Sequence, residues 1–179
     1  KLFFNDVFNV NMIKMKKNLI LWRHAHAEIG NNDFNRHIDE RGKKESKIMA
    51  EFILSQSSPD LILSSPAVRA QETLNSFHNL YSTPKNQIDE SLYLAESDII
   101  IKSISKHAND EAVILIVGHN PGIHELSLSL TNNNQKLMVK FSTCSACFIS
   151  FNDDYWFNII NNECVLEKFV QPKDLKTNY

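Results

Sequence analysis

The sequence is poor in cysteine, glycine and proline, and it has no excess of charge of either sign. Its 179 residues include 3 Cys, 4 Gly and 5 Pro, and 19 Lys and Arg nearly balance 21 Asp and Glu, for a net charge of −2. Three cysteines are too few, and odd in number, for a disulfide framework. The near-neutral balance excludes a broad basic face of the kind that binds nucleic acid, although it allows a small local cluster of cations.

Long apolar runs are also missing, since no run approaches the roughly 18 to 20 residues that a membrane span needs. The first stretch, KLFFNDVFNVNMIKMKKN, has scattered Asn and Asp and no small-residue cleavage site, so it does not resemble a signal peptide. We therefore predict a cytoplasmic protein without a membrane partner. Met15 lies directly before the first strong strand, and we expect residues 1–14 to be an N-terminal extension and residues 15–179 to form one domain.

Two of the cysteines, Cys144 and Cys147, form a C-x-x-C pair of the kind found in redox and zinc sites. The pair lies in FSTCSACFISF, which alternates like a strand, and no second pair of ligands follows. We interpret both cysteines as small, semi-buried strand residues. Free thiols are typical of a reducing compartment, which supports the cytoplasmic prediction.

The composition, with 42% hydrophobic and 22% charged residues, is typical of a packed soluble protein. Over the first two thirds of the chain, short apolar runs alternate with helical patterns. Ala112–Val117 is wholly apolar and rich in β-branched residues, which predicts a buried strand. We predict Asp39 as the N-cap of the first helix, and Ser65 as that of the second, with Pro66 at its first position. The predicted strands are 19–22, 60–63, 87–92 and 112–117, and the predicted helices are 39–56, 66–81, 96–107 and one that follows GHNPG and ends near Leu130.

The last third of the chain favours extended structure. We predict extended segments at 138–141, 146–151, 155–160 and 164–169, with hairpin turns at 152–154 and 161–162. Phe141, Phe148 and Phe151 are expected in the sheet core. Strands that alternate with helices, followed by hairpin-linked strands, predict an α/β sandwich with a mainly parallel sheet and antiparallel additions.

Three of the predicted strands end in residues that can bind or attack an anion. The first strand ends in Arg23-His24, the second is followed by Ser65 and Arg69, and the strongest is followed by His119. In an open α/β sheet, ligands bind outside the carboxyl ends of the strands, so we expect these side chains to meet. The helices that follow Pro66 and Pro121 would direct their N-termini to the same pocket, which favours a phosphate-like anion.

The residue types at these strand ends suit phosphoryl chemistry. Arg23 and Arg69 can bind non-bridging oxygens through forked N–H donors. A neutral His24 offers a nitrogen nucleophile whose phosphorylated form water would hydrolyse, and His119 would donate to an oxygen in the transition state. With four such groups around the phosphoryl group, we expect no need for a metal.

The run LILWRHAHAE, followed in order by LILSSPAVRAQET and IVGHNPG, resembles the histidine phosphatase superfamily, and within it the small SixA-type phosphohistidine phosphatases. Asp33-x-x-Arg36, Gly42 and the ending EKFVQPKDL resemble further parts of that group, so the resemblance covers about residues 16–175. It implies a phosphoglycerate-mutase-like, three-layer α/β/α sandwich with a mainly parallel mixed sheet, and a single histidine phosphatase domain at 15–179.

For the site, the resemblance implies that His24 is the phosphorylated nucleophile and that Arg23, Arg69 and His119 bind the phosphoryl group without a metal. Larger members of the superfamily place a carboxylate after the middle strand to protonate an alcohol leaving group. Here Leu94 stands where SixA-type relatives often have Glu, with Glu96 and Asp98 nearby. We interpret Glu96 as a residue at a helix N-terminus. A weak general acid matters less for a phosphoramidate, because its P–N bond is labile and the nitrogen leaves readily. The site therefore favours such a substrate over a sugar phosphate.

Several other residues have open interpretations. Ser65 could cap a helix or touch the phosphate. Asn120 could cap the next helix, orient His119 or contact the phosphate, and of these roles we favour the cap. His26 forms an H-x-H with His24, a metal-ligand spacing, but no partner ligands follow at similar spacing, so we disfavour a metal site. The histidines without convergent partners are interpreted as surface or packing residues: His37, His78, His107 and His124.

Together these patterns predict a monomeric enzyme that hydrolyses protein phosphohistidine through an intermediate at His24. We expect no cofactor and no nucleic-acid partner. Three alternatives remain open at this point: a phosphatase of the same fold that acts on a small phosphorylated metabolite, a non-catalytic phosphate-binding module, and a metal hydrolase that uses His24 and His26.

Overall fold

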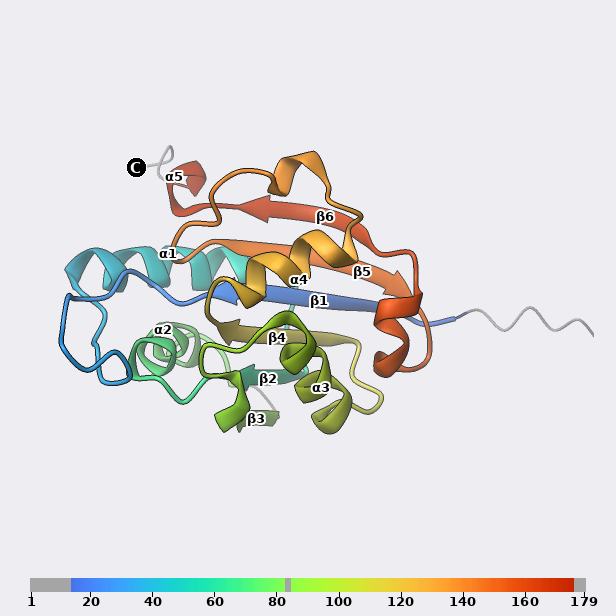
Figure 1. The fold of residues 1–179 in the computed structure, drawn as a ribbon, viewed down its shortest axis with the longest axis horizontal. Helices are drawn as coiled ribbons and strands as arrows, with labels where there is room; N and C mark the ends of the chain where they lie inside the picture. Colours follow the sequence, from blue (N-terminus) through green and yellow to red (C-terminus); the bar gives the residue numbers. More distant parts are fainter. Residues whose placement is uncertain (1–13, 83–84, 176–179) are drawn as a thin grey trace, which may run out of the picture.

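A six-stranded sheet in the order β3-β2-β4-β1-β5-β6 forms the middle of the computed structural model, which describes residues 14–82 and 85–175 (Figure 1). The pairs β3–β2, β2–β4 and β4–β1 are parallel, whereas β1–β5 and β5–β6 are antiparallel. The strands are β1 (Lys16–Arg23), β2 (Leu61–Ser64), β3 (Lys85–Ile88), β4 (Val113–Gly118), β5 (Ala146–Asn152) and β6 (Val165–Val170). Of the extension predicted at 1–14, residues 1–13 lie outside the described residues.

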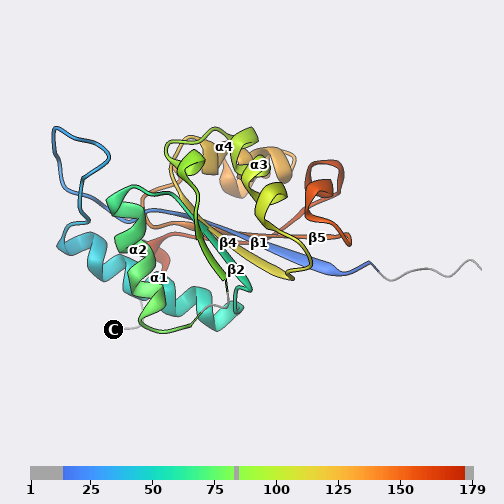
Figure 2. The same cartoon turned by 90° about the horizontal axis from the view of Figure 1, so that it is seen from below.

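Helices cover both faces of the sheet (Figure 2). On one face, α1 (Glu40–Gln56) packs against α2 (Val68–His78) and against the short α5 (Pro172–Leu175). On the other face, α3 (Ser97–His107) packs against α4 (Gly122–Leu130). This arrangement confirms the predicted three-layer α/β/α sandwich with a mainly parallel mixed sheet. Within the described ranges, no helix has the length and apolar character needed to cross a membrane.

The central strand β1 is buried on both of its faces. Leu19 and Leu21 belong to the core beneath α3 and α4, whereas Ile20 and Trp22 belong to the core beneath α1 and α2. All four side chains are 0% exposed. Because successive side chains of a strand point to opposite faces, a strand covered by helices on both sides needs a continuous apolar run, which is the pattern seen in the sequence.

The beginnings of the two helices next to the site differ in how well they were predicted. Asp39 caps α1 as expected, since its side chain accepts a hydrogen bond from Gly42 N at 2.7 Å. The prediction that Ser65 caps α2 is wrong, because the helix begins at Val68 with Ala67 as its cap residue and without a side-chain cap bond. Pro66 therefore lies before the helix, and the Ser65 hydroxyl accepts from Ala67 N, the cap residue, instead of from an N–H of the helix.

In the last third of the chain, two of the predictions of extended structure are wrong. The segment 138–141 contains no strand and follows the 3-10 helix η2 (Gln135–Leu137), and the segment 155–160 lies mostly in a second 3-10 helix, η3 (Trp156–Asn161). Trp156 and Ile159 are buried three residues apart, and a 3-10 helix places such residues on one face. The predicted turn at 152–154 therefore precedes η3 and the one at 161–162 coincides with its end, so neither joins two strands. The predicted strand 87–92 also ends early, at Ile88, before the 3-10 helix η1 (Glu90–Leu92).

The two cysteines of the C-x-x-C pair do not lie in the same strand. Cys147 lies in β5, but Cys144 lies in the preceding turn with φ 64°, so the prediction of two strand residues is wrong for Cys144. Both side chains are fully buried, and burial raises the pKa of each thiol above its ordinary value. The thiolate is the form that binds metals and attacks disulfides, so this environment disfavours both kinds of chemistry.

Candidate active site

The carboxyl ends of β1, β2 and β4 lie at one edge of the sheet, on the left of Figure 1. His24 follows β1, His119 follows β4, and Arg69 lies in the first turn of α2, shortly after β2. Arg69 Nε donates a hydrogen bond to His24 Nε2 at 3.2 Å, and Arg69 Nη2 donates to His119 Nδ1 at 3.2 Å. The two imidazole centroids are 5.1 Å apart. These three predicted side chains are therefore in direct contact.

The contacts of His24 define which of its nitrogens is available. Its Nδ1 lies 2.7 Å from the carbonyl oxygen of Ala25, and because a carbonyl only accepts, Nδ1 carries the proton and Nε2 presents its lone pair. Burial lowers the pKa of His24 from 6.5 to about 2, and the charges of Arg69 and Arg23 act in the same direction. At neutral pH the ring is thus uncharged, which is the form that can attack an electrophile.

His119 has the opposite tautomer. Its Nδ1 accepts from Arg69, so its Nε2 carries the proton and donates it to Ser65 Oγ at 2.7 Å. Burial, followed by the charge of Arg69, lowers the pKa of His119 to about 3. Ser65 is 0% exposed and also accepts from Ala67 N at 3.3 Å. The Ser65 hydroxyl therefore orients the His119 ring, while its contact with phosphate stays a prediction.

Arg69 has a further partner that the sequence analysis did not assign to the site. Asp33 Oδ2 accepts from Arg69 Nη2 at 2.9 Å, and the Asp33 carbonyl accepts from Arg69 Nη1. Tyr93 Oη donates to the same Oδ2 at 2.8 Å. In the sequence, Asp33 stands out only through its place in the Asp33-x-x-Arg36 pattern, and Tyr93, which directly precedes Leu94, has no signal of its role.

Arg23 and Asn120 share an acceptor on the other side of the site. Arg23 Nη1 and Asn120 Nδ2 donate to the carbonyl oxygen of Phe141 at 2.7 and 3.1 Å. Asn120 is thus not the predicted cap of α4, whose preceding residue is Pro121 and which has no side-chain cap bond. Among the atoms that the structure describes, Arg23 Nε and Asn120 Oδ1 are buried without a hydrogen-bond partner. Arg23 therefore keeps a donor that an anion could use.

The residues weighed for other roles lie apart from this cluster. His26 Nδ1 is 2.6 Å from Asp39 Oδ2, so its partner is the cap of α1 and not His24. Within residues 14–82 and 85–175 there is no group of three or more His, Cys, Asp or Glu that could hold a metal ion. The other histidines each have a local partner: His37 with Glu72, His78 with Asn86, His107 with Asp89, and His124 with the Leu137 carbonyl.

The carboxylates near the expected general-acid position face solvent. Leu94 is 49% exposed and has a φ of 49°, Glu96 is exposed and immediately precedes α3, and Asp98 pairs with Lys102 at 2.8 Å. The prediction that Glu96 stands at a helix N-terminus agrees with this placement, although its side chain makes no cap bond. No hydrogen bond of Glu96 or Asp98 to the clustered site residues is found among the described side chains.

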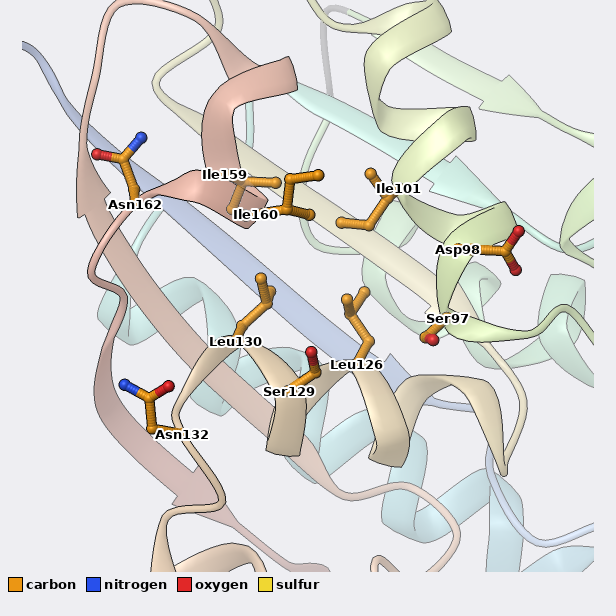
Figure 3. Close-up of a pocket in the computed structure, with 10 residues that line it drawn as sticks. All are labelled: Ser97, Asp98, Ile101, Leu126, Ser129, Leu130, Asn132, Ile159, Ile160 and Asn162. Carbon is orange, nitrogen blue, oxygen red and sulfur yellow. The ribbon is translucent and has the colours of Figure 1, made fainter.

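A separate cavity of about 250 Å³ lies between α3, α4 and η3 (Figure 3). Ile101, Leu126, Leu130 and Ile160 give it an apolar wall, and most of its polar residues stand at its two sides: Ser97, Asp98, Asn132 and Asn162. None of its lining residues is Arg23, His24, Arg69 or His119. This cavity lacks cationic side chains, so the strand-end cluster is the better candidate for anion chemistry.

Sequence comparison finds relatives of limited similarity. No protein-family model matches the chain. An uncharacterized protein of Mycobacterium leprae is 32% identical over 118 residues, which cover 62% of this chain and 71% of that protein. An uncharacterized chloroplastic protein of Arabidopsis thaliana is 27% identical over 156 residues, covering 79% of this chain and 70% of that protein. The mitochondrial serine/threonine-protein phosphatase Pgam5 of Drosophila willistoni is 30% identical over 95 residues, which are 52% of this chain and 33% of that protein.

Comparison with solved structures finds proteins that share this fold over nearly the whole chain. A protein assigned as the phosphohistidine phosphatase SixA of Nakamurella multipartitia superposes with a TM-score of 0.82 at 20% identity, covering 89% of this chain and 98% of its own. The protein histidine phosphatase SixA in complex with tungstate gives 0.74 at 20% identity, covering 89% and 99%. A mycobacterial glucosyl-3-phosphoglycerate phosphatase gives 0.64 at 14% identity, covering 85% and 97%. At these identities the likeness establishes the fold.

Proposed function

The chain has the histidine phosphatase fold, and on that premise we propose that it is a metal-independent phosphatase that hydrolyses protein phosphohistidine through an intermediate at His24. The observation that carries the proposal is the neutral His24 imidazole, whose Nε2 lone pair is held 3.2 Å from Arg69 Nε. A site that only bound phosphate would gain more from a charged imidazolium than from a neutral nucleophile. The burial that keeps the ring neutral therefore favours catalysis over simple binding.

In the first step, Arg69 Nε gives up its hydrogen bond to His24 Nε2 and donates to a phosphoryl oxygen of the substrate instead. The freed lone pair of His24 Nε2 then attacks the phosphorus atom. The P–N bond to the substrate imidazole breaks as the new P–N bond forms, and the leaving nitrogen takes a proton from solvent. Arg69 and the unpartnered Nε of Arg23 bind the non-bridging oxygens, which neutralises their charge and holds the phosphoryl group in line. These two guanidinium groups supply the positive charge that the loose transition state requires.

In the second step, water attacks the phosphorus atom of phosphorylated His24. The P–Nε2 bond breaks, inorganic phosphate leaves, and the proton of the water goes to phosphate or solvent, which restores the neutral ring. The phosphoryl charge raises the pKa of His119 relative to the empty site, because an adjacent anion favours the protonated imidazole. A proton on His119 can then stabilise the developing charge on an oxygen.

The substrate preference follows from the leaving group. An alcohol leaving group needs a strong general acid, and Leu94, Glu96 and Asp98 lie outside the hydrogen-bonded cluster. The nitrogen of a phosphoramidate leaves readily without one. The fold agreement with proteins described as phosphohistidine phosphatases supports this preference.

The decisive experiment is hydrolysis of a phosphohistidine peptide in chelator-treated buffer. We expect the wild type to be active and to carry acid-labile phosphate, and His24→Ala to lose on the order of 10³-fold or more in rate, because the nucleophile is gone. His26→Ala is the matched control, since it removes a neighbouring histidine whose ring hydrogen-bonds to Asp39 and not to the site residues. Full turnover by His24→Ala, or loss of wild-type activity in chelator, contradicts the proposal.

A substrate panel tests the preference for phosphohistidine. The peptide is compared with sugar phosphates and nucleotide phosphates at equal concentration, and we expect the highest kcat/KM for the peptide. A large preference for the metabolites would instead support a phosphomonoesterase of the same fold.

A further inference from the structure

The guanidinium of Arg69 is bound along two different edges. Its side edge, formed by Nε and Nη2, faces the two histidines, with Nε donating to His24 Nε2 and Nη2 to His119 Nδ1. Its terminal edge, formed by Nη1 and Nη2, faces Asp33, whose carbonyl and Oδ2 accept from it. Because a phosphoryl group must reach His24 Nε2, it has to bind the side edge. The terminal edge is left for Asp33.

Asp33 is itself held from two sides. Its Oδ1 accepts from Arg36 Nε at 3.0 Å and from Arg36 Nη2 at 2.6 Å, while its Oδ2 accepts from Tyr93 Oη at 2.8 Å. Burial alone would raise the pKa of Asp33, but the hydrogen bonds from Tyr93 and Arg36 and the charge of Arg69 hold it below its ordinary value. The group is therefore a carboxylate at neutral pH and binds the guanidinium as a charged acceptor.

The loop that carries Asp33 is fixed to α2 and to Tyr93. The Phe34 carbonyl accepts from Val68 N at 3.1 Å, and the Phe34 ring packs edge-on against Tyr93 with centroids 5.1 Å apart. Tyr93 in turn packs edge-on against His119, with centroids 5.6 Å apart. The loop thus forms a continuous chain of contacts from α2 to the His119 ring.

We propose that Asp33 is a positioning residue of the phosphoryl site, which holds the terminal edge of Arg69 so that the side edge stays directed between His24 and His119. Arg69 is 1% exposed, and the long arginine side chain has several rotatable bonds that its contacts must fix. Asp33 and a bound phosphoryl group occupy different edges and can bind Arg69 at the same time. Removing the Asp33 charge should therefore weaken phosphate binding and slow the reaction. The kinetic part of this inference rests on the proposed function, whereas the structural part does not.

The test compares Asp33→Asn and Asp33→Glu with the wild type and with Asp154→Asn, a matched control at an exposed aspartate near η3. The first readout is the NMR signal of Arg69 Nε–Hε in the full chain, identified by its absence in Arg69→Lys. We expect its hydrogen exchange to become at least about tenfold faster in Asp33→Asn, because the guanidinium is no longer fixed. The dissociation constant of inorganic phosphate should rise about tenfold, and Asp154→Asn should change neither value.

The second readout is steady-state turnover of the phosphohistidine peptide. We expect kcat to fall about 10- to 100-fold in Asp33→Asn with KM changed less than about threefold, since a misdirected guanidinium still attracts the substrate but stabilises the transition state poorly. Asp33→Glu keeps the charge and should recover at least part of the loss. Should Asp33→Asn not fold, Tyr93→Phe removes one bond to Asp33 and should shift the same readouts in the same direction by a smaller factor.

Two results would overturn the inference. If Asp33→Asn binds phosphate more tightly, or has a KM lowered by more than about threefold, Asp33 competes with the substrate instead of positioning Arg69. If Arg69 Hε exchanges at the wild-type rate in folded Asp33→Asn, Asp33 does not hold the guanidinium. A wild type without any turnover would refute the proposed function, and in that case NMR and phosphate binding still decide the role of Asp33.

Discussion

The two buried histidines of the site make the stability of the protein depend on pH. His24 and His119 are 7% and 2% exposed, and burial lowers their pKa values from 6.5 to about 2 and about 3. In the unfolded chain both rings regain a pKa near 6.5. Between about pH 6.5 and pH 3 the unfolded state therefore binds more protons than the native state, and the free energy of unfolding falls as the pH is lowered.

The size of the effect follows from the pKa difference. One histidine that is neutral in the native state lowers the free energy of unfolding by about 1.4 kcal/mol at pH 5.5 and by about 2 kcal/mol at pH 5, relative to pH 8. Two such histidines together give about 4 kcal/mol at pH 5. This is a large part of the roughly 5–15 kcal/mol that stabilises a typical domain.

The assay is urea unfolding at pH 8 and pH 5, followed by the fluorescence of Trp22 and Trp156, which are buried in the native state. His24→Asn removes one titrating ring, so the loss of stability between the two pH values should shrink by about 2 kcal/mol. His37→Asn is a control of opposite sign. The hydrogen bond to Glu72 raises the pKa of His37, so His37 adds stability below pH 6.5 that is lost as the pH rises through its folded pKa, and its removal should make the loss at pH 5 larger.

One result would refute this reasoning. If His24→Asn and the wild type lose the same stability between pH 8 and pH 5, with equal m-values, the His24 ring is protonated in the native state at pH 5. The neutral nucleophile of the proposed mechanism would then be lost at that pH.

Three further predictions concern packing, charge and metals. A Cβ at Gly122 would clash with the backbone carbonyl oxygen of Ala95, so Gly122→Ala should destabilise the protein by about 2–3 kcal/mol in urea unfolding and displace His119. At Gly30 the nearest atom to an added Cβ is Arg36 Cγ at an ordinary 3.4 Å, so Gly30→Ala should be nearly neutral. Equal stability of the two variants would contradict the close packing of α4. Arg23→Lys removes the forked donor and should raise the phosphate dissociation constant about tenfold in calorimetry, while an unchanged constant would remove Arg23 from the site. Prolonged dialysis against chelator should leave activity within about twofold, and restoration of lost activity by zinc or manganese would favour a metal hydrolase.

Much of the sheet could be predicted from the sequence because its central strands have an unambiguous composition. β1 and β4 are covered by helices on both faces, so their apolar runs are continuous. Such runs predict buried strands and no other element. His24 and His119 follow those two strands directly, and the rule that ligands bind at the carboxyl ends of parallel strands was enough to place them together. Arg69 could be placed in the site because it follows the end of β2 by only five residues.

The errors arose where local sequence favours two conformations. The run YWFNII is rich in aromatic and β-branched residues and so suggests a strand, but burial of Trp156 and Ile159 on one face selects a 3-10 helix. Ser65 and Asn120 have the side chains of helix caps, yet each forms a hydrogen bond with a group that is distant in the sequence, His119 and the Phe141 carbonyl respectively. Such partners depend on the tertiary fold.

The positions of Asp33 and Tyr93 could not be predicted for the same reason. Asp33 contacts Arg69 at a sequence distance of 36 residues, and Tyr93 contacts Asp33 at a distance of 60. Both side chains lie outside the strands and the regular α-helices, where neither apolar periodicity nor strand-end geometry gives a position. A short motif can indicate that a loop matters, but the contact that explains it requires coordinates.

The place of β1 in the sheet also affects how the protein folds. Both partners of this strand come late in the chain, since Asn18 pairs with Val113 and Trp22 pairs with Ala146. Pairings of such sequence separation carry a large loop-closure entropy and slow the search for the native topology. His24 meets His119 only when that search succeeds, so intermediates in which β1 and β4 are unpaired have no anion site. A bound anion therefore stabilises only the completed fold, by RT ln(1 + [L]/Kd).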